Sequence, residues 1–496
     1  PTASAGPSRT ATAGQALTFQ GSATGTGLTY AWNFGDGTTV NGTLTPTKTY
    51  ANAGTYTVTL TVTDSLGRTA TGNATVTVGS SGGTGSPGGY TGILRTLYVS
   101  PTGSDSNNGS ASSPWATLQK AASNARPGDM IVVRAGTYAG FELTTSGTAT
   151  NPIVFKADPG VLVNAKAPQV SYSKGAINLE GASYVVIDGF KIVMASYGSV
   201  NSNIRSVSNT GVIIRNNVID NAAWWGILTG FSQNVLIEKN TITNTQVQHG
   251  IYVGNSADNP IIRNNYVANS RGSGIQINSD ASQGGDGVVT NALIEGNTLI
   301  NNARVLASSI NLDGVQNSIV RNNLIYGNRN GIALYQIDGA QGAKNNLIVG
   351  NTIVFDAGNG YYPISIVGGS QGSTGNQVYN NILFRTAGSS YGSIGIDSAS
   401  LSGFKSDYNA VVDGFNTGGS ATITLAQWRS QTGQDAHSVV ATPDQLFVDW
   451  RNGNFSLKAG SPAVNAGINL PQLTTDIDGT SRSLGGATDI GAYETF

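Results

Sequence analysis

Side chains able to perform acid and base chemistry lie close together in sequence near the middle of the chain. His249 and Tyr252 come first, and Asp313 and Asp338 follow. Two carboxylates on one surface suit glycoside hydrolysis, with retention expected at a separation of about 5–5.5 Å and inversion at about 6.5–9.5 Å. We therefore take Asp313 and Asp338 as the candidate acid–base pair, with His249 and Tyr252 orienting the substrate.

Short strands with a period of two must position these residues. The strands are expected at 226–228, 250–253, 274–278, 309–313, 331–335 and 363–366. Alternate side chains of a strand point to opposite faces, so the Ile, Leu and Val residues point inward. The outward positions are Leu228, Tyr252, Gln276, Asn278, Asn311, Asp313, Ala333 and Tyr335. Because stacked strands lie about 4.8 Å apart, these positions form one polar and aromatic stripe, over which we expect a groove.

Several of these side chains suit a sugar polymer. Trp225 precedes the first strand, as His249 precedes the second, and its ring can serve as an apolar platform for a sugar. The remaining candidates for binding sugar hydroxyls are Gln276, Asn278, Asn311, Tyr335 and Gln336. The stripe itself contains neutral hydrogen-bonding groups and no lysine or arginine, which favours a neutral glycan.

A repeat organises the chain between residues 183 and 383. Each copy has an apolar pair, two polar or small residues, an asparagine and another apolar stretch, as in VIIRNNVI and IVRNNLI. The last asparagines of the copies are Asn217, Asn240, Asn265, Asn297, Asn323, Asn351 and Asn381. The segments between copies lack a helical apolar period, which argues against leucine-rich repeats and predicts a right-handed parallel β-helix with a structural asparagine ladder.

Two of the repeats carry longer loops, at 279–291 and 336–345. Both loops follow the same strand of their repeat, so they are expected on one side of the stripe. They contain Asp280, Asp286 and Asp338, and the Asp-Gly pairs at 286 and 338 are also typical of turns. Asp280 and Asp286 are possible calcium ligands, although two carboxylates fall short of the roughly 6–8 oxygen ligands that calcium takes.

Residues 1–80 alternate with a period of two between Gly and Asp turns, which predicts an antiparallel β-sandwich of the immunoglobulin-like kind. The segments WNFGDG at 32–37 and GTYTVTLTVTD at 54–64 resemble both halves of the PKD domain signature. This resemblance implies an extracellular spacer or a polymer-contacting module. Residues 81–96 are expected to be a Gly/Ser-rich linker.

Residues 97–496 are expected to be the β-helix with its caps. An amphipathic helix from Trp115 to about Ala125, with Pro114 at its start, is predicted to plug the first coil. This opening block, and the closing segment with DIDGTSR and DIGAYE, resemble secreted β-helix proteins of the pectate-lyase-like and xylosidase-like carbohydrate-active kind. The resemblance implies a fold and a secreted habit, but not a substrate.

Composition excludes several classes of protein. A formal net charge of −1 argues against a strongly basic nucleic-acid binder, and no apolar run is long enough to predict a membrane span. The absence of cysteine excludes disulfides and thiolate metal sites. The chain begins with Pro1, so we expect a leader to have been removed from a secreted, extracellular bacterial protein.

Three functions remain open, with hydrolysis of a polysaccharide as our main hypothesis. The second is a polysaccharide lyase acting on a uronate polymer, with His249 as base, Tyr252 as acid, and Gln276, Asn278 or Arg271 neutralising the carboxylate. The acidic cluster with a partner lysine that the resemblance to pectate lyases implies is absent. The third hypothesis is a non-catalytic surface adhesin, or a subunit of an extracellular homo-assembly.

Overall fold

The computed structural model describes residues 1–496 apart from 7–8, 13–15, 51–53, 80–89, 167–173, 195–199, 306, 356–360, 370, 386–390, 420, 483–485 and 496. The chain divides into two compact units, Pro1–Ile93 and Leu94–Phe496. Residues 81–89 of the expected linker lie outside the described residues. Residues 90–96 of the expected linker are described, and the last two of them already belong to the first strand of the second unit, which begins at Arg95.

The first unit is the predicted β-sandwich. One sheet has the order β2-β9-β8-β5-β6, and the pairs β1-β4 and β3-β7 form two smaller sheets. The bounds are β1 (Thr2–Ser4), β2 (Arg9–Thr12), β3 (Ala16–Thr18), β4 (Ser22–Thr24), β5 (Thr29–Asn33), β6 (Thr39–Asn41), β7 (Thr47–Thr49), β8 (Gly54–Thr63) and β9 (Thr69–Gly79). Phe19, Trp32 and Phe34 are buried between them, with 5.5 Å between the Phe19 and Trp32 ring centroids.

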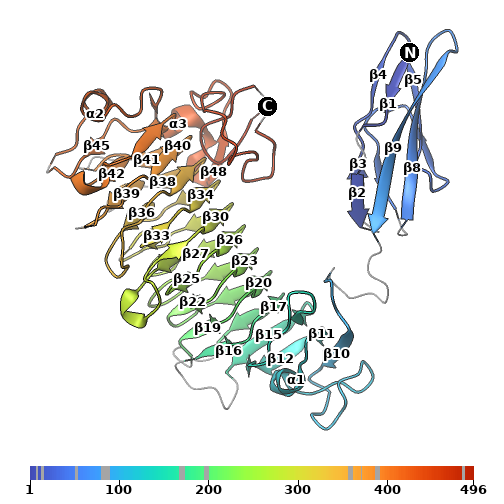
Figure 1. Ribbon diagram of the computed structural model, residues 1–496, viewed down its shortest axis with the longest axis horizontal. Helices are drawn as coiled ribbons and strands as arrows, with labels where there is room; N and C mark the ends of the chain where they lie inside the picture. The colour runs from blue at the N-terminus through green and yellow to red at the C-terminus, as the bar shows by residue number, and fades with distance from the viewer. Residues whose placement is uncertain are drawn as a thin grey trace. The chain divides into compact units, whose positions relative to one another are not determined.

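The second unit winds three long parallel sheets into a β-helix, seen in Figure 1 as strands stacked from β10 to β45. The first sheet contains β10 (Arg95–Val99), β11 (Asp129–Val133), β14 (Ile153–Ala157), β17 (Val185–Asp188), β20 (Ile213–Arg215), β23 (Leu236–Glu238), β26 (Ile261–Arg263), β30 (Leu293–Glu295), β34 (Ile319–Arg321), β37 (Leu347–Val349), β40 (Gln377–Tyr379) and β43 (Lys405–Asp407).

Each coil continues from the first sheet into the second and then the third. The second sheet contains β12 (Gly136–Ala139), β15 (Val161–Ala165), β18 (Lys191–Val193), β21 (Val218–Asp220), β24 (Thr241–Thr243), β27 (Tyr266–Ala268), β31 (Thr298–Ile300), β35 (Leu324–Tyr326), β38 (Thr352–Phe355), β41 (Ile382–Arg385), β44 (Ala410–Val411) and β46 (Val439–Val440). The third contains β13 (Phe141–Glu142), β16 (Gly175–Glu180), β19 (Ser202–Val207), β22 (Trp225–Gly230), β25 (Ile251–Gly254), β28 (Ile275–Asn278), β32 (Ile310–Asp313), β36 (Ile332–Tyr335), β39 (Ile364–Val367), β42 (Ile394–Ile396) and β45 (Phe415–Asn416).

The interior of the coil is a single apolar core. In the third sheet the inward residues are fully buried and come in Ile, Val and Leu pairs, as the period of two predicts. They include Ile251, Val253, Ile275, Ile277, Ile310, Leu312, Ile332 and Leu334. Burial of side chains of this size contributes about 1.5–3 kcal/mol each, so the register of every strand is strongly determined by which face is apolar.

The repeat asparagines form the predicted ladder. Each side-chain amide nitrogen donates to the Oδ1 atom of the asparagine on the next coil at 2.9–3.2 Å. The same Oδ1 atom also accepts from the backbone N–H of the donating asparagine. The ladder runs through Asn217, Asn240, Asn265, Asn297, Asn323, Asn351, Asn381 and Asn409. These residues are buried and fully hydrogen-bonded, so their role is structural.

The outer face of the first sheet carries charges of alternating sign. Successive strands bring Asp188, Arg215, Glu238, Arg263, Glu295 and Arg321 into register. Ion pairs join Arg215 to Asp188 at 2.9 Å, Arg263 to Glu238 at 2.8 Å and Arg321 to Glu295 at 2.5 Å. Each charge therefore has an opposite charge on a neighbouring coil, which favours this stacking order.

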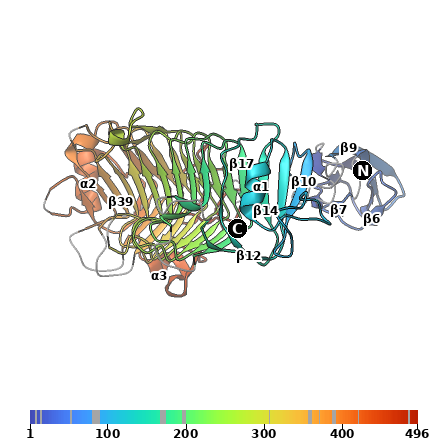
Figure 2. The same ribbon diagram turned by 90° about the horizontal axis from the view of Figure 1, so that it is seen from below.

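Helices lie at the two ends of the β-helix, with α1 beside β10 and β13 and α2 (Leu425–Thr432) near the last coils (Figure 2). The helix predicted from Trp115 to Ala125 is shorter, since α1 spans Leu118–Asn124. The Oγ1 of Thr117 accepts from the backbone N–H of Lys120 and so begins the helix, while Trp115 bridges to Val99 as extended chain. The capping position itself is as predicted, because Leu118 and Ala121 are buried in the core.

The closing segment packs on the outside of the second sheet. It contains α3 (Pro443–Leu446), β47 (Phe447–Asp449) and β48 (Asn454–Leu457), and two further short strands, β29 (Val289–Thr290) and β33 (Val315–Gln316), pair elsewhere in the solenoid. The apolar contact joins Leu446, Phe447 and Phe455 to Val354 and Phe384. The apolar residues of the closing segment therefore cover the second sheet and not the outer face of the third sheet.

We predict that Asn297→Ala lowers the free energy of unfolding of the β-helix by about 2–5 kcal/mol. The reason is that Asn297 accepts from the N and Nδ2 atoms of Asn265 at 3.0 Å and donates to Asn323 and Ile262. Thermal unfolding followed by circular dichroism measures the effect. Thr298→Ala, at the next residue on the outer face, is the control, and an equal change in both variants would contradict a structural ladder.

Candidate active site

The third sheet aligns the predicted stripe in two rows. In the first row Leu228 pairs with Tyr252, Tyr252 with Gln276, and Gln276 with Asn311, which in turn pairs with Ala333. In the second row Asn278 pairs with Asp313 and Asp313 with Tyr335. Strand register therefore brings the candidate residues onto one face, even though they are far apart in sequence.

The amides of this face are largely bonded to one another and to a tyrosine. Asn311 Nδ2 donates to Gln276 Oε1 and to the Tyr335 hydroxyl, both at 2.7 Å, and Gln276 Nε2 donates to the same hydroxyl at 3.1 Å. Gln276 and Asn311 are buried, and burial raises the pKa of Tyr335. Gln276, Asn311 and Tyr335 thus form a rigid polar patch whose groups already have protein partners. Beyond it, Gln336 donates from Nε2 to the Gly339 carbonyl at 3.2 Å.

An aromatic group lies at the other end of the face. Ring centroids are 5.9 Å apart for Trp225 and Tyr252, 5.8 Å for His249 and Tyr252, and 5.7 Å for Trp224 and Trp225. Gly254 makes room for this arrangement, because a Cβ there would lie 2.5 Å from Cε1 of Tyr252. The Trp225 Nε1 atom is buried and has no hydrogen-bond partner among the described residues.

His249 is held as a neutral ring with one defined tautomer. Its Nδ1 accepts a hydrogen bond from the backbone N–H of Ser273 at 2.9 Å, so the ring proton lies on Nε2. Burial lowers the pKa of His249 to about 4. With Nδ1 occupied and Nε2 protonated, the ring donates a hydrogen bond at neutral pH and is poorly suited to act as a base.

Tyr252 is a neutral phenol surrounded by acidic groups. The pKa of Tyr252 is raised to about 12, mainly by burial and to a smaller extent by the negative charges of Asp280, Asp338 and Asp313, while the side chain of Asn278 opposes the shift. The three carboxyl groups therefore share one neighbourhood around this hydroxyl. A phenol with such a pKa keeps its proton at neutral pH and can donate it in a hydrogen bond.

Asp313 binds the backbone of the loop after β36. Its Oδ1 accepts from the N–H groups of Ile337 at 3.0 Å and Gly339 at 3.2 Å, and its Oδ2 accepts from that of Asp338 at 2.8 Å. Asp313 is 1% exposed, and burial raises its pKa although the three backbone hydrogen bonds lower it. In this arrangement the carboxylate positions the loop that carries Asp338, and it does not face solvent.

The two long loops lie together beside the face, as predicted. An antiparallel bridge pairs Asp280 with Gly339, and the Ala281 N–H donates to the Asp338 carbonyl at 3.0 Å. Asp338 is exposed, and its Oδ2 accepts from Asn278 Nδ2 at 3.0 Å. The other amide atom, Asn278 Oδ1, is buried without a partner among the described residues.

The two candidate calcium ligands serve as turn residues. Asp280 Oδ1 accepts from the N and Oγ atoms of Ser282 at 2.9 and 2.6 Å, and Asp286 Oδ1 accepts from Ser256 Oγ at 2.7 Å and Val288 N at 3.1 Å. Within the described part of the chain no group of three or more His, Cys, Asp or Glu side chains is arranged to hold a metal ion. Asp280 and Asp286 alone do not supply the ligands that calcium takes.

Charged residues that the sequence analysis missed extend the same face toward the first coils. Glu142, Asn178 and Arg205 lie in register ahead of Leu228. Lys174 Nζ lies 2.6 Å from Glu142 Oε1 and 3.4 Å from Glu180 Oε2, to which Arg205 is also paired. Cations therefore lie on the same face, although outside the predicted stripe, which begins at Leu228. The alternating pattern of SNIRSV at 202–207 is the signal that could have found Arg205.

The fold and this face define a parallel β-helix protein with a polar and aromatic surface along one sheet. Residues 1–78 match the family described as PKD domain. Residues 97–224 match the Pel9A-like right-handed β-helix region, and residues 226–405 match the right-handed β-helix region. The chain thus carries a PKD domain followed by right-handed β-helix regions, and both fold predictions are confirmed.

Two curated proteins are similar to parts of the chain. The pectate lyase PEL9 of Emericella nidulans is 28% identical over 121 residues, and the uncharacterized protein YwoF of Bacillus subtilis is 32% identical over 107 residues. Each match covers 21% of this chain, but only 30% and 23% of the two relatives. The chain therefore spans less than a third of the length of either relative.

Two solved structures share the fold. The crystal structure of pectate lyase Pel9A is 16% identical with a TM-score of 0.52, covering 82% of this chain and 98% of that one. The complex of XylC with xylose is 12% identical with a TM-score of 0.52, covering 81% and 98%. At these identities the similarity establishes the architecture alone.

We predict that His249 titrates with a pKa of about 4, far below the 6.5 of an exposed histidine, and keeps its proton on Nε2 above that pH. Nitrogen and carbon NMR shifts of the imidazole measure both quantities. The chain has two histidines, so His437→Gln assigns the signal. On acidification the unfolded chain binds the His249 proton near pH 6.5, whereas the folded chain binds it only near pH 4, so the free energy of unfolding falls between these two pH values. We expect a smaller fall in His249→Gln. A His249 pKa near 6.5 would contradict the desolvation of the ring.

Proposed function

We propose that the outer face of the third sheet, from β22 to β36, binds a polysaccharide. The observation that carries this proposal is a pair of buried polar atoms, Trp225 Nε1 and Asn278 Oδ1, that have no partner among the described residues. Buried polar groups are nearly always hydrogen-bonded, and a sugar hydroxyl can both accept from the indole and donate to the amide. The adjoining rings of Trp225 and Tyr252 offer the apolar surface that a sugar ring contacts.

We further propose that the bound polymer is cut by hydrolysis, with Asp338 acting directly on the glycosidic bond. In such a reaction one carboxyl group protonates the leaving oxygen, while a second carboxylate activates water or attacks the sugar. Asp280 is our candidate for the second group, because its loop pairs with that of Asp338. Asp313, which the sequence predicts as one of the two carboxylates, is instead a positioning residue that holds the loop with Asp338. Tyr252 and His249 donate hydrogen bonds to the substrate.

A lyase acting on a uronate polymer is the second candidate. It is favoured by similarity to proteins named pectate lyases, in sequence over a short segment and in fold over most of the chain. Against it, a lyase needs a base that removes a proton beside the carboxyl group, and His249 Nδ1 is already engaged by Ser273. If His249 Nδ1 took up a proton, the backbone N–H of Ser273 would lose its acceptor, and this loss makes His249 an unfavourable base.

The PKD domain and the solenoid in one chain also support secretion, with polysaccharide as the partner outside the cell. In the described residues no helix has the length and apolar character needed to cross a membrane. A non-catalytic adhesin or a subunit of an extracellular assembly would use the same face for binding alone. The cleavage experiment below separates that hypothesis from the enzymatic ones.

We expect Trp225→Ala to weaken polysaccharide binding about tenfold, because it removes both the ring surface and the unpartnered indole N–H. Affinity electrophoresis through gels containing a panel of neutral and acidic polymers measures the change. Tyr266→Ala is the matched control, since Tyr266 is an exposed ring on the second sheet. Equal weakening by both substitutions, or none by either, would contradict binding at the third sheet.

We expect Asp338→Asn to reduce cleavage about a hundredfold or more, since an amide cannot exchange the proton. Reducing ends and the absorbance of unsaturated uronate are followed together, because only a lyase forms the unsaturated product. Asp286→Asn, a loop carboxylate on the same side, is the control. Unsaturated product would identify a lyase, and a wild-type chain that cuts no polymer would leave binding without catalysis.

A further inference from the structure

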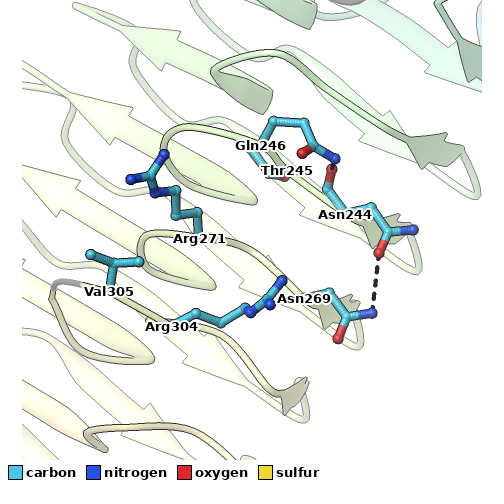
Figure 3. Close-up of a pocket in the computed structure, with 7 residues that line it drawn as sticks. All are labelled: Asn244, Thr245, Gln246, Asn269, Arg271, Arg304 and Val305. Atoms are coloured by element: carbon cyan, nitrogen blue, oxygen red, sulfur yellow. Dashed lines mark hydrogen bonds between the residues drawn. The ribbon is translucent and has the colours of Figure 1, made fainter.

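A pocket opens over the turns that lead from the second sheet to the third. Its volume is about 340 Å³, and the turns that line it stack through backbone hydrogen bonds from Arg271 N to Thr245 O at 3.0 Å and from Val305 N to Arg271 O at 3.3 Å. Figure 3 shows the side chains of Arg271 and Arg304 projecting from neighbouring turns, with Asn269 hydrogen-bonded to Asn244.

The pocket has an excess of positive charge. Arg271 and Arg304 are both exposed, and neither forms an ion pair with a described residue, whereas Arg263 and Arg321 on the first sheet do. No acidic side chain is among the described residues that line the pocket. Asn244, which lines the pocket, is hydrogen-bonded to the carboxylate of Asp220. The Oδ1 atom of Asp220 accepts from both Thr243 Oγ1 and Asn244 Nδ2.

One of the residues that line this pocket carries a buried hydroxyl group without a partner among the described residues. Thr245 lines it and is 2% exposed, yet its Oγ1 has no hydrogen-bond partner within the part of the chain that the structure describes. A buried polar atom of this kind is expected to bond to water or to a ligand. Asn244 and Gln246 add amide groups at the rim.

We propose that this pocket binds an anionic group carried by a saccharide, either the carboxylate of a uronic acid or a sulfate ester. Arginine matches both groups, because its planar fork donates two parallel hydrogen bonds to a pair of anionic oxygens. Thr245 Oγ1 donates a further bond from the floor of the pocket. This inference rests on the proposed function, since it makes the pocket a subsite of the polymer that lies on the third sheet.

The pocket and the candidate active site are built on the same turns. Gly272 N donates to Gln248 O at 2.8 Å, and Ser273 N donates to His249 Nδ1 at 2.9 Å, so the turn with Arg271 also fixes the ring of His249. A polymer crossing the coils beside Trp225 and Tyr252 can therefore place a charged substituent over Arg271 and Arg304. The subsite would select an acidic polymer, in contrast to the neutral glycan that the stripe alone favours.

The double variant Arg271→Gln/Arg304→Gln tests the proposal in the full chain. Polygalacturonate, its fully methyl-esterified form, dextran sulfate and dextran are the probes, and affinity electrophoresis at low and high salt is the measurement. We expect the variant to lose affinity about tenfold to a hundredfold for a charged polymer, and to lose most of the salt dependence. The control Lys191→Gln/Lys239→Gln removes the same charge from exposed sites on the second sheet and its preceding turn, and is expected to bind like the wild type.

Loss confined to polygalacturonate would identify the carboxylate as the ligand, and loss confined to dextran sulfate would identify the sulfate ester. An arginine variant that binds both charged polymers as well as the lysine control does would overturn the inference. Trp225→Ala in the same gels separates the two proposals. If only the tryptophan variant loses affinity, the pocket is not a subsite, but the third sheet still binds polymer. If only the arginine variant loses affinity, the pocket binds anions, and the proposal that the third sheet binds polymer is wrong.

Discussion

The side-chain hydrogen bond from one repeat asparagine to the next is the interaction on which the architecture depends. Each asparagine uses its carbonyl oxygen for two donors of the preceding coil and its amide for the following one, so adjacent coils are joined at the same point of every turn. Apolar packing excludes a one-residue shift, but a shift of two residues keeps the same kind of side chain pointing inward. The ladder adds a directional constraint in the buried interior, where an unmade hydrogen bond costs about 1–3 kcal/mol. All outward rows inherit their alignment from it.

The candidate site is a result of that alignment. Tyr252, Gln276 and Asn311 meet because three coils are stacked in one register, and no local sequence motif contains them together. Most of the polar groups so assembled are satisfied by one another, which gives a stiff surface and not a loose collection of ligands. Two buried polar atoms of the site, the indole N–H of Trp225 and the carbonyl oxygen of Asn278, have no partner among the residues that the structure describes.

Much of the fold could be predicted from sequence because it rests on periodicity. The inward Ile rows, the asparagine ladder and the side on which both long loops lie follow from spacing alone. The roles of individual side chains did not follow, since they depend on backbone groups that no pattern reveals. Asp313 accepts three N–H groups from a loop one coil away, and His249 is fixed by the N–H of Ser273. Arg304 was missed for a similar reason, because it lies in a turn outside the strand pattern.

The alternating charges on the first sheet also constrain how such a solenoid can change its length. Removing the coil that carries Glu238 would place Arg215 beside Arg263, so that like charges would face each other at that junction. Removing the coils of both Glu238 and Arg263 would instead place Arg215 beside Glu295 and preserve every pairing. Duplication and loss of coils in this part of the chain are therefore tolerated electrostatically in pairs, so that the unit of lengthening is two turns of the solenoid although the unit of structure is one.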